Sequence, residues 1–524
     1  MITTRRQLFS GFSEAGTTPQ RRVSISTKKP AALQKGPVPN IMATPAPDDP
    51  TLGAVDPLVI LLNRCTFGFT ESEYQRALTL GFTGWLQEQF NYTALNNSTL
   101  EASIASAYPR VSWTSAQLIT EVASTRRPGL GAKDLTAATL LRQLHSPRQL
   151  FEVMVEFWSN HFNITAAAAP ENFYKVVDDR DTVRANALGT FPNMLKASAR
   201  SLAMQYYLDN VSNTKTGPNE NYARELMELH TLGVTGGYTE TDVKEVARCF
   251  TGWTVTGQIA SAPNFSFLST EHDTGVKTVL DNTIAAGRGI EDGDDVLNIL
   301  ATHPSTAQFI AKKLCVRFIG DTPETTIVDQ VAATYTSTNG DIPSMLWTIF
   351  GSAEFMASYD RKIRRPVEFV IGAMRVLEPT LTGDYLSSVN TPITTMGQVP
   401  FLWPAPNGYP DSLGYWTNTG GLLSRWNWAF GLAEDTITSN SDTTRSIRIN
   451  IPALIGSANT PTTLIDRLSA RLLRRTLATI DRDRFIAFVA QGGSPTQVLT
   501  STTLTTRSRE LIGLMLSSPY FLYR

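Results

Sequence analysis

The chain has no excess of charge of either sign and no long hydrophobic run. Its 524 residues include 46 lysines and arginines against 47 aspartates and glutamates, a formal net charge of −1. Nucleic acids and anionic membranes attract basic surfaces, so this balance favours neither as a partner. A transmembrane helix needs about 20 consecutive apolar residues, and no stretch approaches that length. We therefore expect no nucleic-acid ligand and no transmembrane segment.

Cysteine is scarce, and several enzyme signatures are missing. The three cysteines, Cys65, Cys249 and Cys315, lie far apart in apolar surroundings, which predicts buried free thiols rather than a disulfide framework or a zinc site. The chain contains no H-E-x-x-H metal motif, no G-x-S-x-G elbow, no P-loop and no dinucleotide fingerprint, so the enzyme classes that these motifs mark have no support. The acidic run at 292–295 lacks the glycine and glutamate positions of an EF-hand.

Most of the chain carries the periodicity of helices. Hydrophobic residues make up 42% of the sequence, enough for a large core. We expect an all-α fold, with a single multi-helix globular body over residues 51–524. Two helices have clear starts: one from Pro304 to Phe318, where His303 can supply an N-terminal contact, and one from Pro366 to Leu377.

Residues 1–50 differ from the rest of the chain. They are rich in Thr, Ser, Pro, Ala and Lys and lack hydrophobic periodicity, which predicts a disordered N-terminal arm. Arg5 and Arg6 resemble the pair of a twin-arginine export signal. Such a signal also needs an apolar core of about 7–15 residues, which does not follow, so export is not established.

Two stretches interrupt the helical pattern. Residues 254–284 carry alternating, β-branched and aromatic residues between turn formers, which predicts a small β-hairpin excursion. Residues 391–421 are too rich in proline, glycine and aromatic residues for a helix. The rings of this loop either form a stacking surface for a sugar or peptide or close the core; they are Trp403, Tyr409, Tyr415 and Trp416.

A pair of acidic helices lies at the centre of the sequence. The first is expected to run from Pro218 to the glycine turn at 233–237, with Asn221, Glu225 and Glu228 on one face at i, i+4 and i+7. The second begins after the turn and carries further charged residues beside its buried face. Grouped carboxylates hold a hard cation, or act as general acids and bases when their pKa is raised. The alternative is ordinary ion pairing, including Arg224 with Glu228 at i, i+4.

Histidines in apolar surroundings supply further candidates. His161 ends an aromatic helix and is preceded by Asn160, so polar groups concentrate where the periodicity predicts burial, and buried polar groups need partners. The ordinary role of such a histidine is a hydrogen bond inside the core. His272 and Asp273 follow a predicted strand and form either a metal or acid–base pair or a simple turn.

Our hypothesis is one polar cleft shared by these stretches, in an enzyme with acid–base, hydrolase-like chemistry. The expected catalytic residues are His161, Glu225, Glu228, His272 and Asp273. The expected binding residues are Asn160, Asn219, Asn221, Arg224, Asp242, Glu245 and Arg248. The cofactor is open, with a divalent cation as the candidate. The alternative is a non-catalytic binding or assembly protein in which these polar groups lock helices together.

Several blocks of sequence resemble a known family. They include P-N-E-N-Y-A-R-E-L-M-E-L-H-T-L-G-V from 218, F-W-S-N-H-F at 157–162, H-P-S-T-A-Q-F-I-A-K-K-L at 303–314, R-R-P-V-E-F-V at 364–370 and P-N-G-Y-P from 406. From about residue 55 onward the chain resembles the bacterial family catalogued as domain of unknown function 1800. The resemblance implies no activity. It implies secreted or envelope-associated relatives, and an alkaline-phosphatase-like neighbouring protein as a partner.

Overall fold

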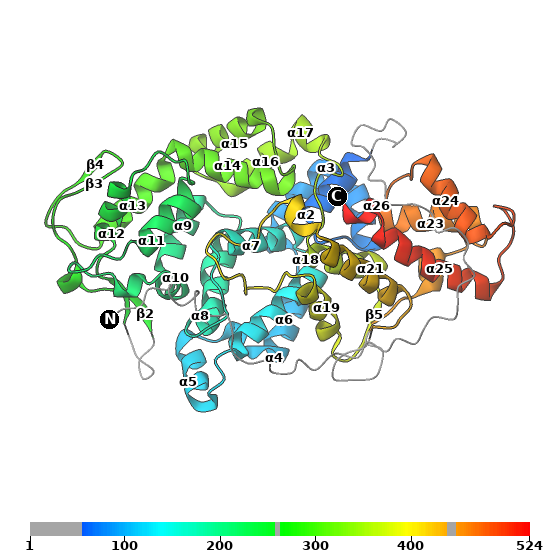
Figure 1. The fold of residues 1–524 in the computed structure, drawn as a ribbon, viewed down its shortest axis with the longest axis horizontal. Helices are drawn as coiled ribbons and strands as arrows, with labels where there is room; N and C mark the ends of the chain where they lie inside the picture. Colours follow the sequence, from blue (N-terminus) through cyan, green and yellow to red (C-terminus); the bar gives the residue numbers. More distant parts are fainter. Residues whose placement is uncertain (1–54, 257–262, 438–446) are drawn as a thin grey trace. The chain divides into compact units, whose positions relative to one another are not determined.

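The computed structural model describes residues 55–256, 263–437 and 447–524, which all belong to one compact unit. Helices make up most of these residues (Figure 1), so the predicted all-α fold is confirmed. The predicted arm, residues 1–50, lies outside the described residues, and the boundary at residue 50 stays a prediction. None of the described helices combines the length and apolarity that a membrane span needs.

The first half of the body places the helices on which much of the candidate site is built. Thr70 caps α3 through a capping box with Glu73, and α3 bends at Gly81, where φ is 69°. The helices are α2 (Pro57–Cys65), α3 (Glu71–Phe90), α4 (Ser98–Ala107), α5 (Ser115–Thr125), α6 (Leu130–His145), α7 (Gln149–His161), α8 (Glu171–Asp178), α9 (Phe191–Arg200), α10 (Leu202–Tyr207), α11 (Glu220–Glu225) and α12 (Glu240–Cys249).

The second half confirms both helices with predicted starts. His303 caps α14, since its Nδ1 accepts a hydrogen bond from the backbone N–H of Ser305 at 3.1 Å. The helices are α13 (Glu291–Thr302), α14 (Pro304–Phe318), α15 (Thr325–Ser337), α16 (Ile342–Phe350), α17 (Ala353–Met356), α18 (Pro366–Leu377), α19 (Tyr385–Thr395), α20 (Leu413–Trp416), α21 (Thr419–Ala433), α22 (Ile451–Ile455), α23 (Pro461–Leu468), α24 (Thr479–Ala490), α25 (Ser501–Ser517) and α26 (Pro519–Leu522).

Short turns of other helix types connect these elements. Three in the described part of the chain are π-helical, a widened turn that is frequent at functional sites: η3 (Asp179–Arg184), η5 (Leu226–Thr231) and η7 (Ser469–Leu473). The 3₁₀ turns are η1 (Tyr92–Ala94), η2 (Pro109–Ser112), η4 (Asn210–Ser212) and η6 (Ser269–Glu271). The helix expected from Pro218 is therefore formed by two elements: α11, which starts at Glu220, and the π-helical η5, which continues it.

The strands form small antiparallel hairpins in the predicted excursion. β1 (Trp253–Thr256) pairs with β2 (Asn264–Phe267), and β3 (Lys277–Val279) pairs with β4 (Asn282–Ile284). A further pair, β5 (Thr380–Leu381) with β6 (Ile447–Arg448), was not expected. Its strands have two residues each, too few for the alternation that identifies a strand in a sequence.

Helix α18 lies at the centre of the core. Every residue from Pro366 to Leu377 is buried, as expected for a helix enclosed on all sides. Its Glu368 forms ion pairs with Arg317 at 2.7 Å, Arg365 at 2.9 Å and Arg524 at 2.6 Å. Burial disfavours the charge, but the three guanidinium groups hold the pKa of Glu368 well below its usual range. The three cysteines are buried free thiols, as predicted.

Candidate functional site

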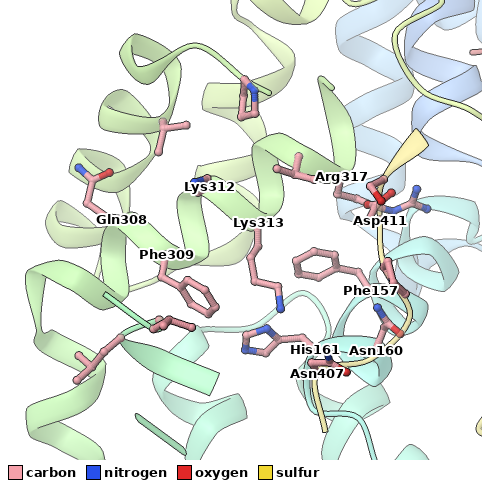
Figure 2. A pocket seen from close by; sticks show the side chains of 18 of the residues that line it. Phe157, Asn160, His161, Gln308, Phe309, Lys312, Lys313, Arg317, Asn407 and Asp411 are labelled. Atoms are coloured by element: carbon pink, nitrogen blue, oxygen red, sulfur yellow. The ribbon is translucent and has the colours of Figure 1, made fainter. Parts of the chain in front are cut away.

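A cavity of about 900 Å³ lies between α7, α14, α15 and the loop 407–412. Figure 2 shows the side chains that line it, drawn from segments far apart in the sequence. The residues that matter for its chemistry are Asn160, His161, Phe309, Lys313, Arg317 and Asp411. We call it the His161–Lys313 cavity.

Helix α14 builds one wall through its spacing. Ser305, Phe309, Lys313 and Arg317 recur every four residues, which places them on one face of the helix, and all four line the cavity. Figure 2 shows the Lys313 side chain pointing toward the ring of His161. Helix α14 thus places the amine of Lys313 beside His161, the last residue of α7.

Asn160 holds the loop that closes the opposite wall. Its Nδ2 donates to the carbonyl of Tyr409 at 2.9 Å, and the N–H of Tyr409 donates to its Oδ1 at 2.7 Å. Gly408 passes so close that a side-chain carbon there would overlap the backbone oxygen of Asn160, and its φ is +71°. The predicted binding residue Asn160 therefore lines the cavity and positions its wall.

His161 is buried at 2% exposure. Its Nε2 lies 3.1 Å from the carbonyl oxygen of His230, and because a carbonyl only accepts, Nε2 carries the proton. The buried Nδ1 has no hydrogen-bond partner among the described residues. Burial, with the charge of Lys313, lowers the pKa of His161 well below its usual value. His161 is thus a neutral imidazole with a free acceptor lone pair.

Lys313 is an amine without a counter-ion in direct contact. The residue keeps some accessible surface, yet its charged end is surrounded by protein, and burial lowers its pKa to about 8 against the opposing charge of Asp411. Nζ lies 5.3 Å from the ring centre of Phe309. Within the described residues, no hydrogen bond or ion pair is assigned to Nζ.

The acidic helix pair contributes its turn, residues 232–235, to the lining of the cavity, whereas its carboxylates lie away from it. Residues 226–231 form η5, whose His230 carbonyl receives the His161 hydrogen bond. Burial, and then the charge of Glu228, raise the pKa of Glu225 to about 7 while Arg224 opposes the shift. Such a value suits a general acid or base. Neither Glu225 nor Glu228 lines the cavity, and their catalytic role stays a prediction.

The ion-pairing alternative named Arg224 with Glu228, but among the described residues Arg224 has other partners. Arg224 instead binds Glu240 of α12 at 2.7 Å and Glu220 at 3.2 Å, because the turn brings the start of α12 against α11. Asn219 caps α11 by accepting from the N–H of Asn221 at 3.0 Å.

The remaining polar residues of α12 and the excursion hold each other in place. Arg248 donates to Glu245 at 2.8 Å and to Asp273 at 2.7 Å. Asp242 accepts from the N–H of Leu280 at 2.8 Å and completes the capping box of α12. These contacts fix the β3–β4 hairpin to α12.

His272 belongs to a second buried cluster. Its Nδ1 lies 2.7 Å from the carbonyl of Thr251, and its Nε2 lies 3.2 Å from Asp292. Lys277 also pairs with Asp292 at 2.7 Å. Of the residues expected to share one cleft, Asn160 and His161 line the His161–Lys313 cavity and the others do not. Across the described ranges, no three His, Cys, Asp or Glu side chains are grouped as metal ligands.

Lys313 and Asp411 line the cavity but are not among the residues predicted from the sequence. The available signal for Lys313 was its spacing of four residues from Phe309 and from Arg317 on the predicted helix, which places these side chains on one face. Both residues also lie in or beside blocks that carry the family resemblance: 303–314 contributes Lys313, and the P-N-G-Y-P block ends one residue before Asp411.

Comparison with known proteins identifies a family and nothing closer. No curated protein matches the chain, and no solved structure matches it. A family model described as a protein of unknown function (DUF1800) matches residues 60–523, nearly the whole chain. The protein therefore belongs to the DUF1800 family, as its sequence blocks predicted.

Proposed function

We propose that the protein is an acid–base enzyme whose active site is the His161–Lys313 cavity. A single observation carries the proposal: an amine without a counter-ion in contact points toward a neutral imidazole whose Nδ1 is free. A cavity of about 900 Å³ lies within the ordinary size range of small-molecule sites. The proposal keeps the acid–base class expected from the sequence and moves its centre to Lys313.

Lys313 acts as the general base. With a pKa of about 8, about a tenth of the amine is unprotonated at pH 7, against far less for an ordinary lysine. A base is most effective when its pKa lies near the working pH, and buried lysines are known to serve in this way. The neutral amine takes a proton from water or from a substrate hydroxyl, which fits a hydrolytic reaction.

His161 and Asp411 support this step. The lone pair on His161 Nδ1 accepts a hydrogen bond from the substrate and orients it beside Lys313. Proton transfer creates an ammonium ion, which the carboxylate of Asp411 stabilises. Burial opposes the charge of Asp411, but Lys362 at 2.8 Å holds its pKa below the usual range, so this carboxylate stays ionised. Phe157 and Phe309 enclose the apolar part of the substrate.

The test measures the amine directly and needs no substrate. Pulse labelling with acetic anhydride at pH 6–11, followed by peptide mass spectrometry, gives the pH at which each lysine becomes reactive. We expect half-maximal labelling of Lys313 near pH 8. Lys312, exposed on the same helix, is the matched control and should become reactive only at a clearly higher pH than Lys313. Equal profiles for the two lysines would overturn the proposal.

The second test of the proposal measures the effect of Lys313 on enzymatic activity. In a screen of ester, amide and phosphate substrates, Lys313→Met should lower the rate of any hydrolysed compound by about 10²–10⁴-fold. Lys312→Met should leave it within about twofold, because an exposed side chain at the rim takes no proton. An active Lys313→Met protein would exclude Lys313 as the base.

A second candidate is binding without catalysis, with an alkaline-phosphatase-like protein as the partner. It is favoured by Val234, which lines the mouth of the cavity and is 71% exposed. Single exposed apolar residues are common, so this candidate ranks second. It requires no reactive amine, and the labelling profile of Lys313 therefore separates the two.

A further inference from the structure

Behind Asn160 lies a second, smaller cavity of about 60 Å³, which we call the Asp179 cavity. Helices α6 and α7 and the π-helical η3 all turn polar side chains toward it. Thr139 and Gln143 of α6 are four residues apart and share a face. Asp179 comes from η3, and Asn160 also lines the larger cavity.

Oxygen atoms in this cavity lack partners. Asp179 is 2% exposed and Gln143 is 3% exposed. Asp179 Oδ1, Gln143 Oε1 and Thr139 Oγ1 are buried without a hydrogen-bond partner among the described residues. Leaving one buried acceptor unpaired costs about 1–3 kcal/mol, and a buried charge costs more. Three such unpaired oxygens lining one cavity indicate a bound group that oxygen atoms coordinate.

The nearby cations are already paired with other acids. Arg184 binds Glu152 at 2.7 and 3.0 Å, and Lys175 binds Asp178 at 2.7 Å. Asp179 is therefore the carboxylate left without an ion pair in this part of the fold.

We propose that the Asp179 cavity binds one monovalent metal cation, Na⁺ or K⁺, through the side-chain oxygens of Asp179, Gln143 and Thr139. Carboxylate, amide and hydroxyl oxygens are the ligands of hard cations. One unpaired carboxylate balances one positive charge. The space is large enough for an ion with a few waters, since about 10–15 Å³ of such volume holds one water.

The surroundings favour single over double charge. Burial raises the pKa of Asp179, and Arg184, Arg142 and Lys175 exert the opposing attraction. Each of these three cations is paired with its own acid, since Arg142 also binds Glu101 at 2.8 Å. The net charge left at the site is therefore that of the Asp179 carboxylate, which one monovalent ion balances. A proton on Asp179 is the competitor, so binding should strengthen as the pH rises.

The experiment follows thermal unfolding of the full chain. Protein exchanged into tetramethylammonium chloride, whose methyl groups keep oxygen ligands away from its charge, receives NaCl, KCl or MgCl₂ at constant ionic strength. We expect Na⁺ or K⁺ to raise Tm by about 1 °C per tenfold increase above the dissociation constant. Asp179→Asn should lose this rise. Asp181→Asn, an exposed carboxylate of the same η3 that pairs with Arg180, should keep it.

Gln143→Met supplies a second variant that removes an oxygen without touching the carboxylate. It should shift the midpoint of the Na⁺ or K⁺ dependence to higher concentration, and it tests the site if Asp179→Asn does not fold. Three results would overturn the proposal: equal Tm values in all monovalent salts, a rise with Mg²⁺ alone, or an Asp179→Asn protein stabilised equally in every salt. The last result would indicate a protonated carboxyl in a water-filled cavity.

Discussion

At the scale of single residues, the presence of ion-pair partners, and not burial alone, decides which buried groups stay charged. Glu225 and Lys313 lose hydration without gaining a full ion pair, and their pKa values move toward neutrality, to about 7 and about 8. Glu368 is more deeply buried, yet three guanidinium groups hold its pKa well below the usual range. Groups of the first kind suit proton transfer, whereas groups of the second kind suit structure.

Glu225→Gln tests this distinction through pH. The folded protein raises the pKa of Glu225 from 4.5 to about 7, so the folded state binds more protons than the unfolded state between these values. Wild-type stability should therefore fall as the pH rises from about 4.5 to about 7. Glutamine does not ionise. The variant should exceed wild type by about 1 kcal/mol at pH 8, after allowance for solvent screening, and by much less at pH 5.

Urea unfolding at the two pH values measures the difference. Glu324→Gln, at an exposed glutamate directly before α15, is the control and should show the same small effect at both. A Glu225→Gln protein that is less stable than wild type at pH 8 would instead indicate that the carboxylate forms a structural ion pair.

At the scale of elements, the sequence predicted what depends on local signals. Helices α14 and α18 have the predicted bounds because a proline at the first turn marks each start. The α11–η5 segment differs, because a π-turn leaves no mark in a pattern sought near 3.6 residues per turn. His161 was found because it is polar where burial was expected. Lys313 was missed because a lysine on a helix is usually exposed, and its cavity is made by segments that meet only in the folded chain.

The wall formed by loop 407–412 depends on one glycine. Gly408 has a φ of +71° and abuts Asn160, so Gly408→Ala adds both backbone strain of about 1–2 kcal/mol and a steric overlap. We expect a loss of at least about 2 kcal/mol in the free energy of unfolding, together with a shift in the labelling pH of Lys313 as Asp411 moves.

Gly414→Ala, with open space around the added carbon, should change stability by less than about 0.5 kcal/mol. Equal effects of the two substitutions would mean that Gly408 does not hold the wall.

At the scale of the whole body, the Glu368 ion pairs join helices that are distant in sequence and also reach the His161–Lys313 cavity. Arg317 reaches Glu368 from α14, and Arg524 reaches it while its Nη1 donates to the carbonyl of Asn63 at 3.1 Å. Arg317 and Arg365 also line the His161–Lys313 cavity. The arginines Arg317 and Arg365 thus belong both to the ion-pair cluster of the core and to the lining of the candidate site.

Glu368→Gln should therefore be the most damaging of these substitutions. It leaves three buried guanidinium groups without their common carboxylate, and breaking a buried pair by removing one partner costs about 3–5 kcal/mol. The pKa of Glu368 is depressed, so its contribution is present in full above the unfolded pKa and is lost only as the pH falls through the lower, folded value. The deficit of the variant should then be the same at pH 6 and pH 8 in urea unfolding. Glu240→Gln breaks an exposed pair with Arg224 and should cost much less stability, because exposed ion pairs contribute little. Comparable losses in the two variants would show that the arginines around α18 find other acceptors, and that the Glu368 cluster does not hold these helices together.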